Sequence, residues 1–241
     1  MKLYVIGLGP GEEKQMTLWA KQALEECSIL IGYQGYIDSI AADYPEKRYF
    51  STPMTREVER CRMALKEAGA GNIVGMVCSG DSGVYGMAGL IYELAEEYPP
   101  VEIEIIPGVT AAVSGAALLG APLMNDFAII SLSDLLTPWE DIEKRLRAAA
   151  GADFVICLYN PSSRRRAGHL KRACRIILEY QDGDTVCGLV RNIGRTGETA
   201  RLLTLSQMKN ATADMFTTIF IGSSGTRSIN GKMVTLRGYR K

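Results

Sequence analysis

Short apolar segments alternate with longer segments that mix apolar and charged residues along the whole chain. Apolar runs of four to eight residues are typical of buried strands, whereas apolar residues three or four positions apart indicate one face of a helix. The pattern predicts strands at Leu3–Ile6, Ser28–Ile31, Ile73–Cys78, Val101–Ile106, Phe127–Leu132, Phe154–Tyr159, Thr185–Val190, Arg201–Leu205 and Phe216–Ile221. It predicts helices at Lys14–Cys27, Glu57–Ala68, Tyr85–Glu97, Val109–Leu119, Pro138–Ala149 and Arg165–Tyr180.

Strands that alternate with helices predict an α/β fold. The 241 residues allow one large domain or two smaller ones. A helix rich in Ala and Gly ends at Gly120–Asp126, where a new strand begins, and Gly and Pro mark the change. We therefore expect two α/β domains, residues 1–122 and 123–241, with ligands near the carboxyl ends of strands.

Composition narrows the possible partners. Hydrophobic residues make up 47% of the chain, and 27 Lys and Arg balance 27 Asp and Glu, so the surface lacks the basic excess of most duplex-binding proteins. The apolar start of the chain is too short for a signal sequence, and no later run reaches the length of a membrane span. We expect a cytoplasmic protein with no nucleic-acid or membrane partner.

Cysteine and histidine usage restricts the chemistry. The six cysteines are scattered with no C-x-x-C pair, which argues against a disulfide framework or a zinc site. His169 is the single histidine, so a Ser/His/Asp or Cys/His nucleophile system and a His-ligated metal are both disfavoured, and we expect no metal.

Three glycine-containing segments follow predicted strands. Gly7–Gly11 reads G-L-G-P-G, but Pro10 disrupts the dinucleotide spacing and no Walker pattern follows. Cys78–Gly86 carries Asp81, which could bind a hydroxyl or amine or, like Ser82, cap a helix. Pro107–Ala117 is rich in small residues that allow close approach of a ligand or simple helix packing. Three such loops predict a shared small-molecule cleft.

Arginines cluster in the second half of the chain. Asn160–Arg166 ends in three arginines, and Arg191, Asn192, Arg195 and Arg201 form a second group. Such charge runs usually face solvent, although guanidinium groups also bind carboxylates in bidentate geometry. His169 follows the first group and is more typical of a packing or capping residue than of a catalytic one.

The three glycine segments resemble those of the tetrapyrrole methylases, the class III S-adenosylmethionine methyltransferases. The resemblance rests on G-L-G-P-G at Gly7–Gly11, S-G-D-S-G-V-Y-G-M-A-G-L at Ser79–Leu90 and P-G-V-T-A at Pro107–Ala111, and it extends over essentially the whole chain. Further segments look like the branch that methylates C17 of the macrocycle. These are Leu118–Phe127, Ser131–Trp139, Tyr159–Arg164 and Thr235–Tyr239.

This resemblance implies a homodimer whose two α/β domains hold S-adenosylmethionine and methylate a precorrin or cobalt-precorrin, with contraction of the macrocycle. It implies cofactor contacts from both halves of the chain, by Pro10, Gly80, Asp81, Val84, Tyr85, Thr110, Ala111, Tyr159, Asn192 and Met215. An electrophilic methyl sulfonium needs alignment and exclusion of water rather than a nucleophilic side chain.

The acetate and propionate groups of such a substrate favour arginine contacts, for which we predict Arg164, Arg165 or Arg191. The proton movements of ring contraction point to Ser131, Ser133, Asp134 and His169, and Asp81 could meet either the cofactor or the macrocycle. These catalytic candidates are Asp81, Ser131, Ser133, Asp134 and His169.

Three other functions stay open at this point. A related corrin or sirohaem methyltransferase would have a different target carbon, and a nucleotide-binding oxidoreductase would bind a nicotinamide cofactor. A non-catalytic cofactor-binding module would need only the loops of the first half.

Overall fold

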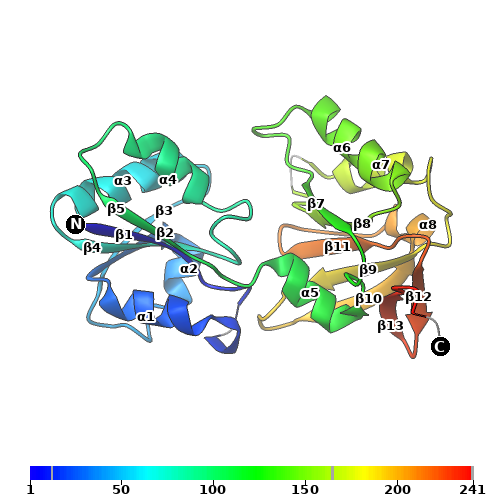
Figure 1. Cartoon of the computed structure of the whole chain (residues 1–241), viewed down its shortest axis with the longest axis horizontal. Coiled ribbons are helices and arrows are strands. Elements are labelled where there is room, and N and C mark those ends of the chain that lie inside the picture. The colour runs from blue at the N-terminus through cyan, green and yellow to red at the C-terminus, as the bar shows by residue number, and fades with distance from the viewer. Residues whose placement is uncertain (12, 164–165, 240–241) are drawn as a thin grey trace. The chain divides into compact units, whose positions relative to one another are not determined.

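The computed structural model describes residues 1–11, 13–163 and 166–239. The chain divides into two compact units, residues 1–110 and 111–241, each built from helices and strands (Figure 1). The α/β fold class expected from the sequence is therefore confirmed.

The first unit is a five-stranded parallel sheet in the order β3-β2-β4-β1-β5. Its elements, in chain order, are β1 (Lys2–Gly7), the 3₁₀ turn η1 (Glu13–Gln15), α1 (Leu18–Glu26), β2 (Ile29–Tyr33), α2 (Gln34–Asp38), β3 (Arg48–Thr52), α3 (Glu57–Gly69), β4 (Ile73–Cys78), α4 (Ala88–Ala95) and β5 (Glu102–Ile106). Because the central strands are buried on both faces, they read as continuous apolar runs rather than as alternating patterns.

Helices cover both faces of this sheet (Figure 1). Leu3 and Val5 of β1 face α3 and α4, whose Leu65 and Ile91 lie in the same core cluster. Tyr4 and Ile6 point to the opposite face and share a cluster with residues of α1 and α2. Successive side chains of a strand alternate between faces, so β1 supplies both cores.

The second unit has a five-stranded mixed sheet, β10-β9-β11-β8-β7, and a small sheet, β12-β13-β6. Its elements are α5 (Ala111–Leu119), β6 (Gly120–Ala121), β7 (Phe127–Ser131), α6 (Trp139–Gly151), β8 (Val155–Tyr159), α7 (His169–Ile177), β9 (Val186–Arg191), β10 (Thr199–Thr204), α8 (Leu205–Met208), β11 (Thr217–Ile221), β12 (Thr226–Ile229) and β13 (Lys232–Thr235). Strand β7 is parallel to β8, whereas β11 is antiparallel to both β8 and β9.

Helices α6, α7 and α8 pack on one face of the larger sheet, and α5 packs on the other. The small residues of α5 allow this close packing. A Cβ on Gly115 would lie 3.0 Å from both Ile193 and Phe220, and one on Gly188 would lie 2.3 Å from Leu119. Within the small-residue run, Gly115 therefore serves helix–sheet packing.

The contacts divide the chain at Thr110, earlier than the division after Pro122 that the sequence favoured. The reason is α5, whose Ala112, Ala116 and Leu119 share a core cluster with Phe220 of β11. A helix that looked like the end of the first domain thus packs as the first element of the second unit.

The six cysteines are all buried and free. Burial raises the pKa of the Cys157 thiol to about 12, so it stays protonated at neutral pH and packs as a small apolar side chain. Among the described residues, no helix is both long enough and apolar enough to cross a membrane.

Candidate functional site

The three glycine-containing loops follow β4, β1 and β5, which are adjacent strands of the first sheet. The Gly9 N–H donates to the Gly80 carbonyl at 3.0 Å, and the Gly80 N–H donates to the Gly9 carbonyl at 2.7 Å. A Cβ on Gly108 would lie 2.1 Å from the Gly80 oxygen and 2.6 Å from the Gly7 oxygen. The three loops that the sequence grouped therefore lie in direct backbone contact.

Asp81 connects two of these loops through its carboxylate. Its Oδ1 accepts the N–H groups of Gly83 at 2.8 Å and Val84 at 3.1 Å, and its Oδ2 accepts the Gly108 N–H at 2.9 Å. These bonds give the carboxylate a positioning role within the loops.

Neither Asp81 nor Ser82 caps α4. The N-cap residue of this helix is Met87, which makes no side-chain capping bond, and the buried Ser82 hydroxyl donates to the Ile106 carbonyl at 3.1 Å. The capping alternative for this loop was therefore wrong, because the loop extends several residues before α4 begins.

Three residues of the same loops have a positive φ. Gly9 and Gly80 have φ values of 77° and 68°, and Tyr85 has a φ of 54° although it carries an aromatic side chain. A non-glycine residue at positive φ costs about 1–3 kcal/mol and occurs preferentially at ligand sites. The Tyr85 side chain is 55% exposed, and Val84 beside it is half-buried.

The remaining cofactor candidates of the first half lie near the same loops or just after them. Pro10 is buried in the loop after β1, and Thr110 is half-buried at the end of the first unit. Ala111 is the first residue of α5 and belongs to the second unit.

In the second unit, β7, β8 and β9 run in the same direction, so their carboxyl ends share one edge of the sheet. Their last residues are Ser131, Tyr159 and Arg191. Asn192 follows β9, and Met215 precedes β11, whose first residue Thr217 pairs with Arg191. Five candidates from separate parts of the sequence thus lie along one edge, which we call the second-unit edge.

Ser131 is the centre of a small polar network at this edge. Its hydroxyl oxygen accepts the Ser133 N–H at 3.2 Å and an amide N–H of Asn160 at 3.0 Å. Asn160 has a φ of 52°. Asn160 was not among the predicted site residues, although its position directly after β8 places it where ligands of α/β sheets bind.

His169 begins α7 and contacts the loop after β7. Its Nδ1 lies 2.9 Å from the Leu132 carbonyl oxygen, which can only accept, so Nδ1 carries the proton. Its Nε2 is 3.6 Å from Asp134 Oδ2, and its ring lies 4.6 Å from the ring of Trp139. This arrangement orients Nε2 as the imidazole nitrogen able to accept a proton.

Three further contacts order the second-unit edge. The backbone N–H of Ala112 donates to the Tyr159 hydroxyl at 2.6 Å, which connects α5 with the end of β8. Arg191 forms an ion pair with Asp214 at 2.6 Å, and Asp214 also accepts the Thr217 hydroxyl at 2.8 Å. Asp214 could not be predicted from the sequence, because its pairing with Arg191 depends on the antiparallel register of β9 and β11.

Asn192 has a φ of 54° and is half-buried, and its amide donates to the Gly197 carbonyl at 3.4 Å. Met215 is 46% exposed. The predicted substrate contacts Arg164 and Arg165 lie outside the described residues. In the described part of the chain, no group of three or more His, Cys, Asp or Glu residues could hold a metal ion.

A parallel α/β unit with three touching glycine loops, followed by a mixed α/β unit with a polar sheet edge, is typical of α/β proteins that bind small molecules. The model of the tetrapyrrole (corrin/porphyrin) methylases matches residues 2–209. The chain therefore belongs to the tetrapyrrole methylase family. It is a methyltransferase, and its methyl donor is S-adenosylmethionine.

The similarity to individual relatives extends over the full chain. A probable cobalt-factor III C(17)-methyltransferase of Salmonella typhimurium is 47% identical, with 98% of this chain and 99% of the relative covered. A cobalt-factor III methyltransferase of Priestia megaterium is 46% identical over 100% of this chain, which spans only 45% of that relative. The crystal structure of the methyltransferase CobJ has a TM-score of 0.91 at 36% identity, with 98% and 99% of the two chains covered.

Proposed function

We propose that this protein transfers a methyl group from S-adenosylmethionine to C17 of a precorrin-3-type tetrapyrrole, with ring contraction, in cobalamin biosynthesis. The observation that carries the proposal is the 47% identity to the Salmonella relative, which spans both chains almost completely. A different target carbon on another corrin or sirohaem intermediate is the alternative within the family.

The loops of the first unit suit the methyl donor. Gly83 is exposed, and a Cβ there would meet only Asp81 Oδ1 at 3.3 Å, so backbone and ligand can approach closely. The exposed Tyr85 ring offers an apolar surface beside it. We propose cofactor contacts by the residues that the family resemblance implies, namely Pro10, Gly80, Asp81, Val84, Tyr85, Thr110, Ala111, Tyr159, Asn192 and Met215.

The bound donor supplies an electrophilic methyl group, so the protein mainly has to orient both reactants and exclude water. Asp81 keeps the loops after β4 and β5 in register through its three accepted N–H groups. We propose that Arg191, whose guanidinium forms an ion pair with Asp214, also binds a carboxylate of the macrocycle. Arg164 and Arg165 are proposed as further carboxylate contacts.

Ring contraction requires proton movements, for which we propose His169. Since Leu132 holds the proton on Nδ1, Nε2 is free to accept one, and Asp134 would stabilise the resulting imidazolium. The hydroxyls of Ser131 and Ser133 are the other proposed proton carriers. We also propose that the protein works as a homodimer in the cytoplasm.

Calorimetric titration with S-adenosylhomocysteine tests the cofactor assignment, with NADH as the control ligand of the oxidoreductase alternative. Incubation with S-adenosylmethionine and either cobalt-factor III or precorrin-3B, followed by product mass and NMR, tests the substrate and the carbon. A gain of one methyl group on C17 supports the proposal and identifies the metallated or metal-free route. A methyl group on another carbon, or no binding of S-adenosylhomocysteine, overturns it.

The proton-transfer assignment needs its own variants. His169→Gln, Asp134→Asn, Ser131→Ala and Ser133→Ala are compared for methyl transfer and for ring contraction. A variant that methylates normally but accumulates the uncontracted product supports the assignment. Full contraction activity in all four variants contradicts it.

A further inference from the structure

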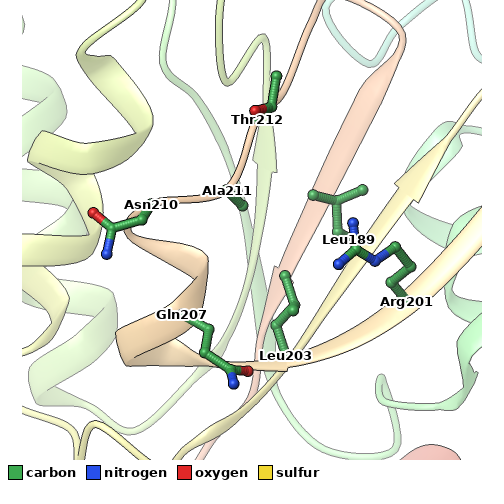
Figure 2. Close-up of a pocket in the computed structure, with 7 residues that line it drawn as sticks. All are labelled: Leu189, Arg201, Leu203, Gln207, Asn210, Ala211 and Thr212. Atoms are coloured by element: carbon green, nitrogen blue, oxygen red, sulfur yellow. The ribbon is translucent and has the colours of Figure 1, made fainter.

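A pocket of about 330 Å³ opens on the second unit, and its lining residues belong to none of the glycine loops. Figure 2 shows side chains from β9, β10, α8 and the segment that follows α8 around it. Leu189 of β9 and Leu203 of β10 provide its apolar part, on the face of the sheet that α6, α7 and α8 cover. Leu189 is buried, whereas Leu203 is half-buried beside the short helix α8, residues Leu205–Met208.

Among the described residues that line this pocket, Arg201 is the one that carries a charge, and it is exposed. It is opposite Leu189 in the β9–β10 register, and its side chain extends toward Leu189 in Figure 2. Within the described residues, the Arg201 guanidinium takes part in no hydrogen bond or ion pair, in contrast to Arg191, which pairs with Asp214. A guanidinium beside an apolar surface is available to bind an anion bidentately.

The remaining polar groups of the pocket are neutral. Gln207 uses its carbonyl oxygen to accept the Thr204 N–H in the capping box of α8, which leaves its NH₂ group to donate. Asn210 and Thr212 add an amide and a hydroxyl on the segment after α8. One cation, neutral donors and two leucines together match a planar anion attached to a short hydrocarbon chain, rather than a multiply charged phosphate.

We propose that this pocket binds a carboxylate on a short aliphatic chain, with the carboxylate on Arg201 and the hydrocarbon part on Leu189 and Leu203. Its volume is at the lower limit of small-molecule sites, which span about 300–1,000 Å³, so it is too small for a whole tetrapyrrole. Two sources have this chemistry. One is a free short-chain carboxylic acid. The other is a single acetate or propionate arm of the macrocycle, and this second source rests on the proposed function.

Butyrate is a suitable probe, with butyramide as its neutral counterpart. In protein labelled at the leucine methyl groups, saturable shifts of the Leu189 and Leu203 signals by butyrate are expected, and butyramide should bind much more weakly. Arg201→Gln should weaken butyrate binding at least about tenfold, since a hydrogen-bonded ionic contact is lost. Arg145→Gln is the matched control, because Arg145 is exposed on α6 and is not a pocket residue.

Shifts that do not saturate at Leu189 and Leu203, or an unchanged butyrate affinity in Arg201→Gln, would overturn the proposal. Retained S-adenosylhomocysteine binding shows that the variant is folded. Steady-state kinetics then separate the two sources. A raised KM for the macrocycle in Arg201→Gln identifies the substrate arm, whereas an unchanged KM with lost butyrate binding identifies a free carboxylic acid. The butyrate titration does not depend on methyl transfer, so failure of the proposed function would leave its result intact.

Discussion

At the scale of single residues, the substitution Asp81→Asn can distinguish a positioning role of this carboxylate from a catalytic role. Asp81→Asn keeps the size of the side chain but replaces one acceptor oxygen with an NH₂ group, so at least one of the three N–H groups loses its acceptor. We expect a loss of about 1–3 kcal/mol in the free energy of unfolding and weaker S-adenosylhomocysteine binding, measured by urea titration and calorimetry.

Ser82→Ala serves as the control, because it removes only the hydrogen bond to the Ile106 carbonyl and leaves the Asp81 contacts in place. A direct catalytic role for Asp81 would instead give an Asp81→Asn variant with normal stability and normal cofactor affinity but slow turnover. That result would contradict the positioning role.

The contacts between the glycine loops leave no space for a side chain at Gly108. In Gly108→Ala the new Cβ would lie 2.1 Å from a backbone oxygen, so the loops after β4 and β5 would have to separate. We expect a destabilisation of several kcal/mol, or failure to fold, as judged by circular dichroism and thermal unfolding. Gly89→Ala in α4 has no atom within 4 Å of the new Cβ and should stabilise the protein by up to about 1 kcal/mol. Equal thermal stabilities of the two variants would contradict this.

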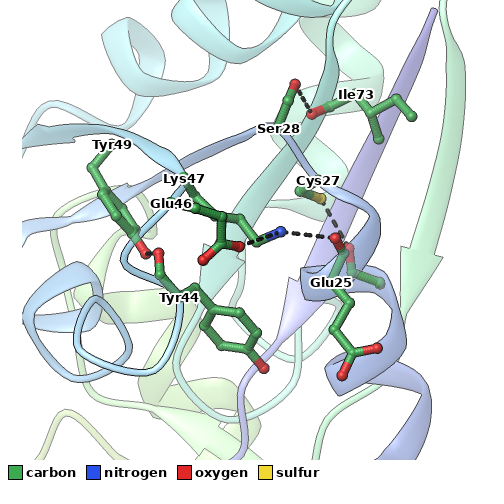
Figure 3. Close-up of polar contacts among 9 residues, drawn as sticks. Glu25, Cys27, Ser28, Tyr44, Glu46, Lys47, Tyr49 and Ile73 are labelled. Carbon is green, nitrogen blue, oxygen red and sulfur yellow. Dashed lines mark hydrogen bonds and ion pairs between the residues drawn. The ribbon is translucent and has the colours of Figure 1, made fainter.

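At the scale of secondary-structure elements, the C-terminus of α1 depends on a lysine that is distant in sequence. Figure 3 shows the Lys47 ammonium between Glu46 and the backbone oxygen of Glu25, to which it donates at 2.7 Å. Only 7% of the Lys47 side chain is exposed. A cation at the last carbonyls of a helix satisfies their unpaired oxygens and interacts favourably with the helix dipole.

Lys47→Met keeps most of the side-chain volume but removes this charge. We expect a loss of about 1–2 kcal/mol in the free energy of unfolding, determined by urea titration. Lys144→Met is the comparison, because Lys144 is 78% exposed and its ion pair with Asp141 should contribute less than about 1 kcal/mol. A Lys47→Met variant as stable as Lys144→Met would show that the α1 contact has no energetic importance.

A comparison of the predicted strands with those in the structure shows which strands can be recognised from the sequence. Strands β1 and β4 were predicted within one residue at each end, because their apolar runs are long and buried. Strand β3 was missed, since the edge strand Arg48–Thr52 has only one buried residue. The hairpin of β12 and β13 was missed although Asn230 and Gly231, both at positive φ, form the Asn-Gly turn that such hairpins favour.

The parts of the candidate site that consist of one continuous segment could be predicted from the sequence. Glycine loops after strands could be located from the sequence, and the parallel order of β4, β1 and β5 brought them together. The contacts of Asp214 with Arg191, and of Asn160 with Ser131, bridge separate parts of the chain. They depend on strand register and loop conformation, which periodicity does not determine.

At the scale of the whole molecule, the packing of α5 predicts which fragments of the second unit can fold. In residues 111–241, α5 covers the sheet face that holds Cys157, Val190 and Phe220, and β6 pairs with β13. In residues 123–241, the division that the sequence favoured, this apolar face would lose both α5 and β6. Burial of apolar surface contributes about 25 cal/mol per Å², so the loss of one helix from a small unit removes several kcal/mol.

We therefore expect fragment 111–241 to unfold cooperatively with dispersed NMR signals, and fragment 123–241 to aggregate or to lack a cooperative transition. Leu119→Ala in the longer fragment should weaken it by about 2–5 kcal/mol, because Leu119 packs onto Gly188 from a nearly fully buried position. If fragment 123–241 were instead as stable as fragment 111–241, α5 would be dispensable for the second sheet. The first unit would then end near Pro122, as the sequence pattern alone indicated.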